Sequence, residues 1–218
     1  MVIISNFHRF LVTGKIVDEN FGFNGRFVFS YLFLKVFIVL LIVYLRILFF
    51  GFNSVHGNVI FDDENVLRLF LNVVVLGPIF EEMIFRYHFN FSKKGIYISA
   101  AFACFLLYDE WNLLLSVLFY LLILFFIIDK KVKFNRMIFI YCSSVIFACS
   151  HLITYPEIFA TQNIIEIIFI VGPHFIGGLL LSYVFFRNGI FAAIALHSLW
   201  NFIFYTIFIF KLAVLGEI

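Results

Sequence analysis

Long runs of apolar residues, separated by short polar segments, dominate the chain. Seven runs approach the ~20 residues that a helix needs to cross a bilayer. They cover about 29–51, 67–90, 95–108, 112–128, 137–157, 164–186 and 189–210. The chain lacks the strict alternation of half-buried strands, and backbone groups in lipid must be satisfied within their own segment. The sequence therefore predicts an all-α, polytopic transmembrane bundle of about seven spans (six to eight, because the third run is short).

Charged residues in the connecting segments alternate in sign along the chain. Basic residues precede the first run and follow the second, fourth and sixth runs: Arg9, Lys15, Arg26, Lys93, Lys94, Lys130, Lys131, Lys133, Arg136 and Arg187. The other segments are acidic: Asp62, Asp63, Glu64, Asp109, Glu110 and Glu157. Because cytoplasmic loops carry the excess of Lys and Arg, this pattern predicts a cytoplasmic N-terminus. We expect one domain, 1–218, whose residues 1–27 form a cytoplasmic N-terminal segment without a cleavable signal peptide.

The composition supports a membrane location. Hydrophobic residues make up 64% of the 218 residues, charged residues only 13%, and the mean hydropathy is +1.10. Soluble domains are closer to half apolar, so the surplus here is expected to face a lipid bilayer. The net charge of +2 gives no reason to expect a nucleic-acid partner.

Ionisable side chains inside the apolar runs are the candidates for chemistry, because they are costly in a membrane and usually face a protein interior or a wet cavity. They are Glu81, Glu82 and Arg86 in the second run, His151 in the fifth, and His197 with Asn201 in the seventh. Helical spacing puts Glu82 and Arg86 on one face, where they can pair. His197 and Asn201 likewise share a face. Glu81 points about one-quarter turn away and is left free to face another group.

A carboxylate, two histidines and an amide on three spans supply a base, its partner and two oxyanion donors, as amide hydrolysis requires. A structural interpretation stands beside this one, since a Glu82–Arg86 pair alone is more often a buried ion pair that fixes packing. His174 has no partner at helical spacing and is interpreted as structural. His88 is expected near the water, and Lys35 either snorkels or lines a cavity.

Three segments in this order resemble the motifs of the CPBP family of intramembrane proteases, which includes the CaaX prenyl endopeptidases (Ras-converting enzymes) and the bacterial Abi proteins. They are Glu81-Glu82-Met83-Ile84-Phe85-Arg86, Phe147-Ala148-Cys149-Ser150-His151 and His197-Ser198-Leu199-Trp200-Asn201. Each motif alone is weak, but three in order, each inside a run, form a strong signal. The resemblance spans about 79–202, the expected protease-like core. The main departure is two extra apolar segments between the first and second motifs, an even number that preserves the relative direction of the motif helices.

The resemblance implies a role for each motif residue. Glu81 would act as the general base on a water that it shares with His151. His197 and Asn201 would stabilise the oxyanion of the tetrahedral intermediate. The remaining two residues would support the site by fixing their helix and tuning the base; they are Glu82 and Arg86.

The resemblance also implies hydrolysis that depends on glutamate and uses no metal, so we expect no cofactor. A zinc ion held by Glu81, His151 and His197 is the alternative, because two histidines and one carboxylate can leave an open fourth position. The sequence has no His-Glu-x-x-His helix, the usual source of such ligands.

The function expected from these observations is an intramembrane endopeptidase that acts on a membrane-associated peptide or protein, with or without an attached lipid. Its expected location is a bacterial plasma membrane. Two alternatives stay open: a non-catalytic scaffold or bacteriocin-immunity-type protein, and a small proton-coupled transporter. The chain shows no internal repeat of the kind that many transporters have.

Overall fold

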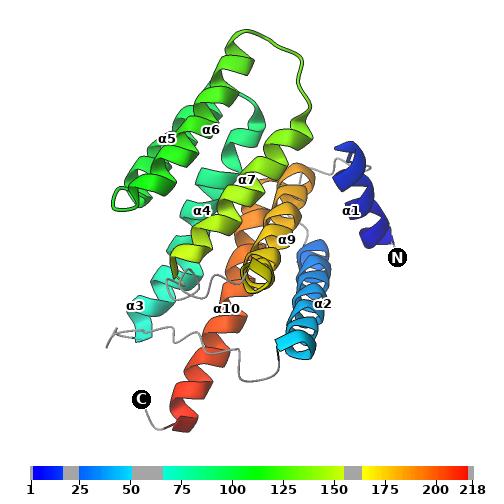
Figure 1. Ribbon diagram of the computed structural model, residues 1–218, viewed down its shortest axis with the longest axis vertical. Coiled ribbons are helices and arrows are strands. Elements are labelled where there is room, and N and C mark those ends of the chain that lie inside the picture. Colours follow the sequence, from blue (N-terminus) through cyan, green and yellow to red (C-terminus); the bar gives the residue numbers. More distant parts are fainter. Residues whose placement is uncertain (1, 17–24, 51–65, 155–163, 216–218) are drawn as a thin grey trace.

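The computed structural model describes residues 2–16, 25–50, 66–154 and 164–215, and their regular structure is entirely helical (Figure 1). The main helices are α1 (Val2–Thr13), α2 (Gly25–Phe50), α3 (Val66–Phe70), α4 (Gly77–Phe85), α5 (Lys93–Leu106), α6 (Trp111–Asp129), α7 (Arg136–Ser150), α9 (Ile164–Asn188) and α10 (Ile190–Leu215). A π-helical segment, Leu71–Leu76, joins α3 to α4. Short 3-10 turns, Tyr87–Asn90 and His151–Thr154, follow α4 and α7. The all-α prediction is confirmed.

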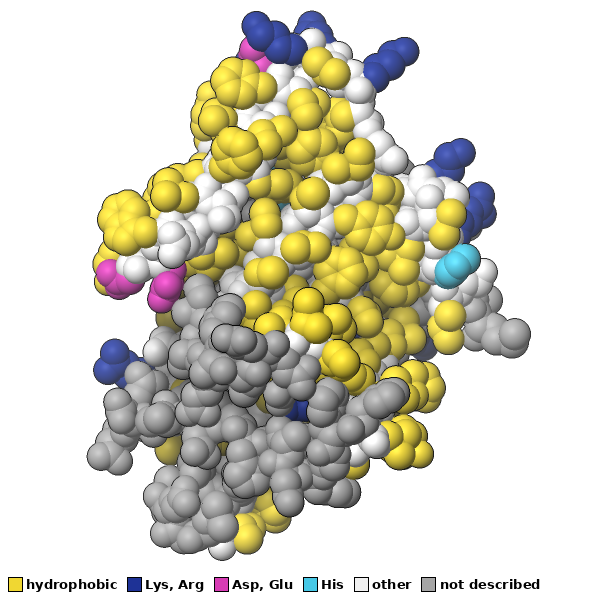
Figure 2. Space-filling model, in the orientation of Figure 1, with side chains coloured by type: hydrophobic (Ala, Val, Ile, Leu, Met, Phe, Trp, Pro, Cys, Tyr) yellow, Lys and Arg dark blue, Asp and Glu magenta, His cyan; other side chains and the backbone are white. Residues whose placement is uncertain are grey.

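Four of these helices are long and apolar enough to cross a membrane. They are Gly25–Leu48, Trp111–Asp129, Ile167–Asn188 and Ile190–Phe210. Large apolar side chains cover their outer faces: Phe33 of α2 is 73% exposed, and Phe119 of α6 is 65% exposed. Hydrophobic side chains accordingly dominate the face of the molecule seen in Figure 2. Such a surface is stable only against lipid, so the chain is an integral membrane protein.

The count of seven full-length spans is not confirmed. The run predicted over 67–90 is divided by the π-helical segment and ends in a 3-10 turn. The run over 95–108 is α5, whose 14 residues reach about 21 Å along a helix axis. The run over 137–157 forms α7, of 15 residues, and its residues 155–157 lie outside the described part of the chain. These three segments are too short or too interrupted to be simple spans.

The basic segments lie at one end of the bundle, as the charge alternation requires. Lys93 Nζ donates to Asp129 Oδ1 at 2.6 Å, which joins the start of α5 to the end of α6. A cavity between the end of α1, the start of α7 and the α9–α10 junction is lined by Lys15, Arg136 and Gly189. Lys and Arg side chains gather at the top and upper right of Figure 2. That this end faces the cytoplasm stays a prediction, and the acidic residues 62–64 and 157 lie outside the described residues.

Two apolar clusters form the core on either side of the site. One joins α1, α2, α9 and α10 around Tyr183 and Leu180. The other joins α4, α5, α6 and α7 around Leu124 and Phe147. Helix α7 packs against α9, and α9 packs against α10, so these contacts hold the two halves together. The polar residues described below lie where the halves meet.

Helix α1 was not predicted, because residues 1–27 were expected only as a polar segment. The rings of Phe7 and Phe10 pack on Tyr183 of α9, with centroid distances of 5.5 and 5.1 Å. The Tyr141 hydroxyl of α7 donates to the Leu11 carbonyl at 3.0 Å. The N-terminal segment is therefore part of the bundle.

Helix α4 ends inside the bundle, where its last carbonyls need donors other than water. Three side chains supply them: Ser99 Oγ to Met83 O at 2.7 Å, His88 Nδ1 to Ile84 O at 3.0 Å, and Ser143 Oγ to Phe85 O at 2.8 Å. The expectation for His88 was wrong, because only 1% of its surface is exposed and its Nε2 contacts the Tyr120 hydroxyl at 2.8 Å. The end of α4 is thus held by α5, α7 and its own 3-10 turn.

We expect Ser143→Ala to lower the free energy of unfolding by about 1–3 kcal/mol, because the buried Phe85 carbonyl loses its side-chain donor. The measurement is the unfolding transition of the purified protein in detergent. Ser116→Ala is the matched control: the exposed Ser116 hydroxyl donates within its own helix, to Asn112 O at 2.7 Å. Equal stability of the two variants would contradict this account of the end of α4.

Candidate active site

A cavity of about 530 Å³ lies among α2, α4, α7, α9, α10 and the π-helical segment. Its polar lining residues are Lys35, Asn72, Glu81, His151, His174, His197, Trp200 and Asn201. The structure thus brings residues of all three motifs to one cavity, although Glu81 and Asn201 lie 120 positions apart in the chain. Four of the six motif residues selected from the sequence line this cavity. The other two, the supporting residues Glu82 and Arg86, do not line it.

That supporting pair is a fully buried ion pair. Arg86 Nη1 lies 3.2 Å from Glu82 Oε1, with 1% and 0% of the two side chains exposed. His197 Nδ1 donates to the same Oε1 at 2.9 Å. One carboxylate oxygen therefore holds a guanidinium from its own helix and an imidazole from α10.

Arg86 extends this contact to two further helices. Its guanidinium lies over the Phe147 ring of α7, 4.1 Å from the centroid. Its Nη2 donates to the Gly178 carbonyl of α9 at 3.4 Å. Because a buried charge is costly without compensating partners, these contacts fix how α4, α7 and α9 meet.

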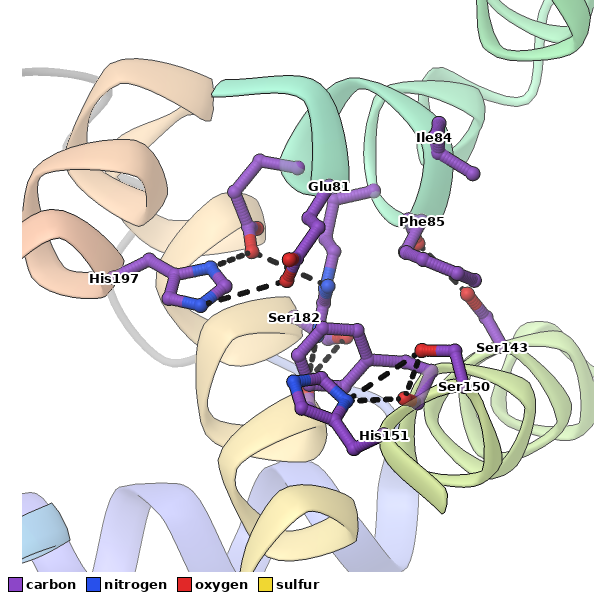
Figure 3. A network of polar contacts seen from close by, with 12 residues as sticks. Glu81, Ile84, Phe85, Ser143, Ser150, His151, Ser182 and His197 are labelled. Atoms are coloured by element: carbon purple, nitrogen blue, oxygen red, sulfur yellow. Dashed lines mark hydrogen bonds and ion pairs between the residues drawn. The ribbon is translucent and has the colours of Figure 1, made fainter. Parts of the chain in front are cut away.

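His197 bridges the two adjacent glutamates, as Figure 3 shows. Its Nε2 lies 3.6 Å from Glu81 Oε2. The Glu81 side chain is 26% exposed, whereas Glu82 is completely buried. Glu82 accepts from Nδ1–H, so the opposite ring nitrogen always faces Glu81. The quarter-turn between the two glutamates therefore separates their roles, with Glu82 in the packed interior and Glu81 at the cavity.

His151 directly follows α7 and is oriented by the end of that helix. Its Nδ1 lies 2.9 Å from the Phe147 carbonyl. A carbonyl only accepts hydrogen bonds, so Nδ1 carries the proton, and Nε2 keeps its lone pair in the neutral ring. The ring also stacks on His174 of α9, with centroids 3.9 Å apart. His151 is therefore fixed in the tautomer that accepts a proton at Nε2.

Asn201 is oriented by an irregularity of the backbone. Gly77 N donates to Asn72 O, five residues back, as in a π-helix. In that register the Val73 carbonyl would need a donor from Pro78, which has no N–H. Asn201 Nδ2 supplies it, at 2.9 Å from Val73 O. A side chain at position 77 would not fit this turn, since its Cβ would lie 2.9 Å from Asn72 O.

Sequence reasoning missed several lining residues because their partners lie on other helices. His174 was interpreted as structural, yet it stacks on His151 and borders the cavity. Asn72 and Trp200 gave no signal of their own. Lys35 did give one, a lysine inside an apolar run, and of its two interpretations the structure supports the cavity.

Comparison with protein families gives one match. The family model for the Rce1-like type II CAAX prenyl endopeptidases matches residues 63–203, well over half of the chain. The chain belongs to this family. The match includes the three motifs and the two extra segments between them. No curated protein and no solved structure matches the chain.

The zinc alternative stays a prediction for this Rce1-like chain. Among the described residues, no three His, Cys, Asp or Glu side chains lie close enough together to hold a metal ion. Glu81, His151 and His197 border one cavity but do not form such a set. The Nδ1 atoms of both histidines are bonded to protein acceptors, which leaves the Nε2 atoms for other partners. We therefore derive no step through a metal ion.

We expect Arg86→Met to lower the free energy of unfolding by about 3–5 kcal/mol, because the buried Glu82 carboxylate loses its cation. The double variant Glu82→Gln/Arg86→Met should be more stable than Arg86→Met alone, since no unpaired charge is left in the interior. Arg9→Met, on an exposed position of α1, is the control. Unfolding in detergent measures all three. An Arg86→Met protein as stable as Arg9→Met would show that the ion pair does not organise the site.

Proposed function

We propose that this Rce1-like chain is an intramembrane endopeptidase that hydrolyses a peptide bond of a membrane-associated substrate. The observation that carries the proposal is the convergence of a carboxylate, two imidazoles and an amide, from three distant segments, on one cavity of a membrane protein. These groups can activate water and stabilise an oxyanion. The Glu81 side chain is 26% exposed, so the described contacts do not enclose it completely.

In the proposed reaction, Glu81 is the general base. A water in the cavity gives its proton to the carboxylate as its oxygen attacks the scissile carbonyl carbon. His151 accepts a hydrogen bond from the same water at Nε2, the nitrogen that its helix leaves unprotonated. The proton held by Glu81 then passes to the leaving nitrogen as the C–N bond breaks, which releases an amine and a carboxylic acid.

His197 and Asn201 supply the oxyanion donors. Proton transfer neutralises Glu81, which weakens its attraction for His197 Nε2 and frees that nitrogen, in its protonated form, to donate to the oxyanion. Asn201 Nδ2 has two hydrogens, of which one bonds the Val73 carbonyl and the other is left for the substrate. Removal of one oxyanion donor costs about 100- to 1,000-fold in kcat in a well-studied protease.

The supporting pair makes these roles possible. Glu82 holds the His197 ring at Nδ1, so the ring presents Nε2 to Glu81 in one orientation. Arg86 neutralises Glu82 and leaves a single carboxylate, Glu81, for the chemistry. Two adjacent glutamates thus carry out different tasks, because one is paired and buried and the other faces the cavity.

We expect Glu81→Gln and His151→Ala each to lower the rate of cleavage by about 100- to 10,000-fold, the usual contribution of general acid–base catalysis. The assay incubates nanodisc-embedded protein with a defined peptide pool and measures the products by mass spectrometry. Glu110→Gln, at an exposed loop position, is the control. Undiminished cleavage by a folded Glu81→Gln protein would reject the mechanism and favour a scaffold role.

We also expect cleavage to survive removal of metal ions. The protein is dialysed against 1,10-phenanthroline and EDTA, its metal content is measured by mass spectrometry, and the rate is compared before and after. Because the proposed base and donors are all side chains, the rate should stay within about twofold, less than the tenfold that 1.4 kcal/mol represents. A loss of activity that added zinc restores would replace this mechanism with a metal-dependent one.

A further inference from the structure

Lys35 is a buried cation that the proposed chemistry does not use. It lies near the middle of the α2 span, outside the segment that matches the family. Only 7% of its surface is exposed, and it borders the same cavity as Glu81, His151 and His197. A lysine at this depth is costly, so it is expected to meet a specific partner.

The described contacts of Lys35 are with an aromatic ring and a glycine. Its Nζ lies 4.4 Å from the centroid of the Trp200 ring, in a cation–π contact. Gly177 of α9 lies beside its end: a Cβ there would lie 3.4 Å from Cε and 3.5 Å from Nζ, in ordinary van der Waals contact. The ammonium is thus held in place on one side by Trp200.

Among the described residues, no side chain forms a hydrogen bond or ion pair with Lys35, which distinguishes it from the buried residues Arg86 and Arg187. Arg86 has Glu82 at 3.2 Å. Arg187 donates to the hydroxyls of Tyr31 and Tyr183, at 2.7 and 3.3 Å. An ammonium has three donors, and a ring face accepts without consuming them all. The Lys35 amino group is therefore held at one place, and its remaining donors border the cavity.

We propose that Lys35 binds a carboxylate of the substrate and so selects peptides that carry one near the scissile bond. This inference rests on the proposed function, since it assigns the occupant of the same cavity. The carboxylate comes either from the free C-terminus of the peptide or from an Asp or Glu side chain.

The charges around the cavity favour a singly charged group. Arg86 already neutralises Glu82, and His197 lies between Glu82 and Glu81, so Lys35 is the cavity cation without a carboxylate partner among the described residues. A carboxylate brings one negative charge to one free cation. A phosphate dianion would exceed that charge and be repelled by Glu81. An ammonium held over Trp200 also binds as a point charge, which suits a single carboxylate.

The experiment compares three peptides of otherwise identical sequence: one with a free C-terminal carboxylate, one with a C-terminal carboxamide, and one with a carboxamide and an Asp next to it. Each carries a dansyl group at its N-terminus. Binding to the Glu81→Gln protein in nanodiscs is measured by fluorescence, and cleavage by the wild-type protein by mass spectrometry. The binding arm needs no catalysis, so it tests Lys35 even if the chain cleaves nothing.

We expect the carboxylate peptide to bind, and to be cleaved, about 10- to 100-fold better than the carboxamide, the usual range for a hydrogen bond to a charged group. Lys35→Met should reduce this ratio towards one, and Lys35→Arg should keep most of it. Lys93→Met, on an exposed lysine that pairs with Asp129, should leave the ratio unchanged. If the Asp peptide recovers the preference, the side chain is an accepted source; if it does not, the chain end is the source.

Equal binding of the carboxylate and carboxamide peptides to the Glu81→Gln protein would overturn the assignment. So would a Lys35→Met protein that weakens both peptides by the same factor, because the lysine would then act through packing. The wild-type protein could cleave no peptide while the preference for binding the carboxylate peptide still depends on Lys35. That outcome would keep the anion site and reject the proposed peptidase activity. Unfolding transitions of the variants confirm that each ratio is measured on folded protein.

Discussion

The site depends on one buried carboxylate. Glu82 has no exposed surface, and its Oε1 receives Arg86 from the same helix and His197 from α10. A carboxylate in such a place is stable only when it is paired and hydrogen-bonded, so its two partners are as constrained as it is. His197 in turn places Nε2 beside Glu81, 3.6 Å away. The position of His197 Nε2 relative to Glu81 therefore depends on the buried contact between His197 and Glu82.

The backbone around the site follows the same rule, because a membrane interior offers no water to unpaired carbonyls. The end of α4 and the π-helical segment before it both leave backbone carbonyl oxygens without a partner in their own helix. Side chains from other helices meet them, with Ser143 on Phe85 O and Asn201 on Val73 O. Irregular backbone is common at functional sites, and here it orients Asn201 at the cavity.

Much of the fold and of the candidate site could be predicted from the sequence. The predictions that were wrong failed for identifiable reasons. Spacing of four residues gave the Glu82–Arg86 pair, since a helix alone determines which side chains are neighbours. The interruption of the run 67–90 was not predicted, because the π turn depends on Pro78 together with a donor from α10, which no local pattern contains. His88 was misjudged for a related reason: its partner, Tyr120, belongs to another helix. The roles in catalysis stay proposals.

The contact between His197 and Glu82 has a consequence for biogenesis. The two residues are 115 positions apart, so the acidic motif enters the bilayer long before the ring that completes it. Until α10 has inserted, Glu82 has only Arg86, and Glu81 faces no imidazole from that helix. A nascent chain thus carries no assembled site before α10 has been made. Assembly of the proposed site therefore waits for the insertion of α10.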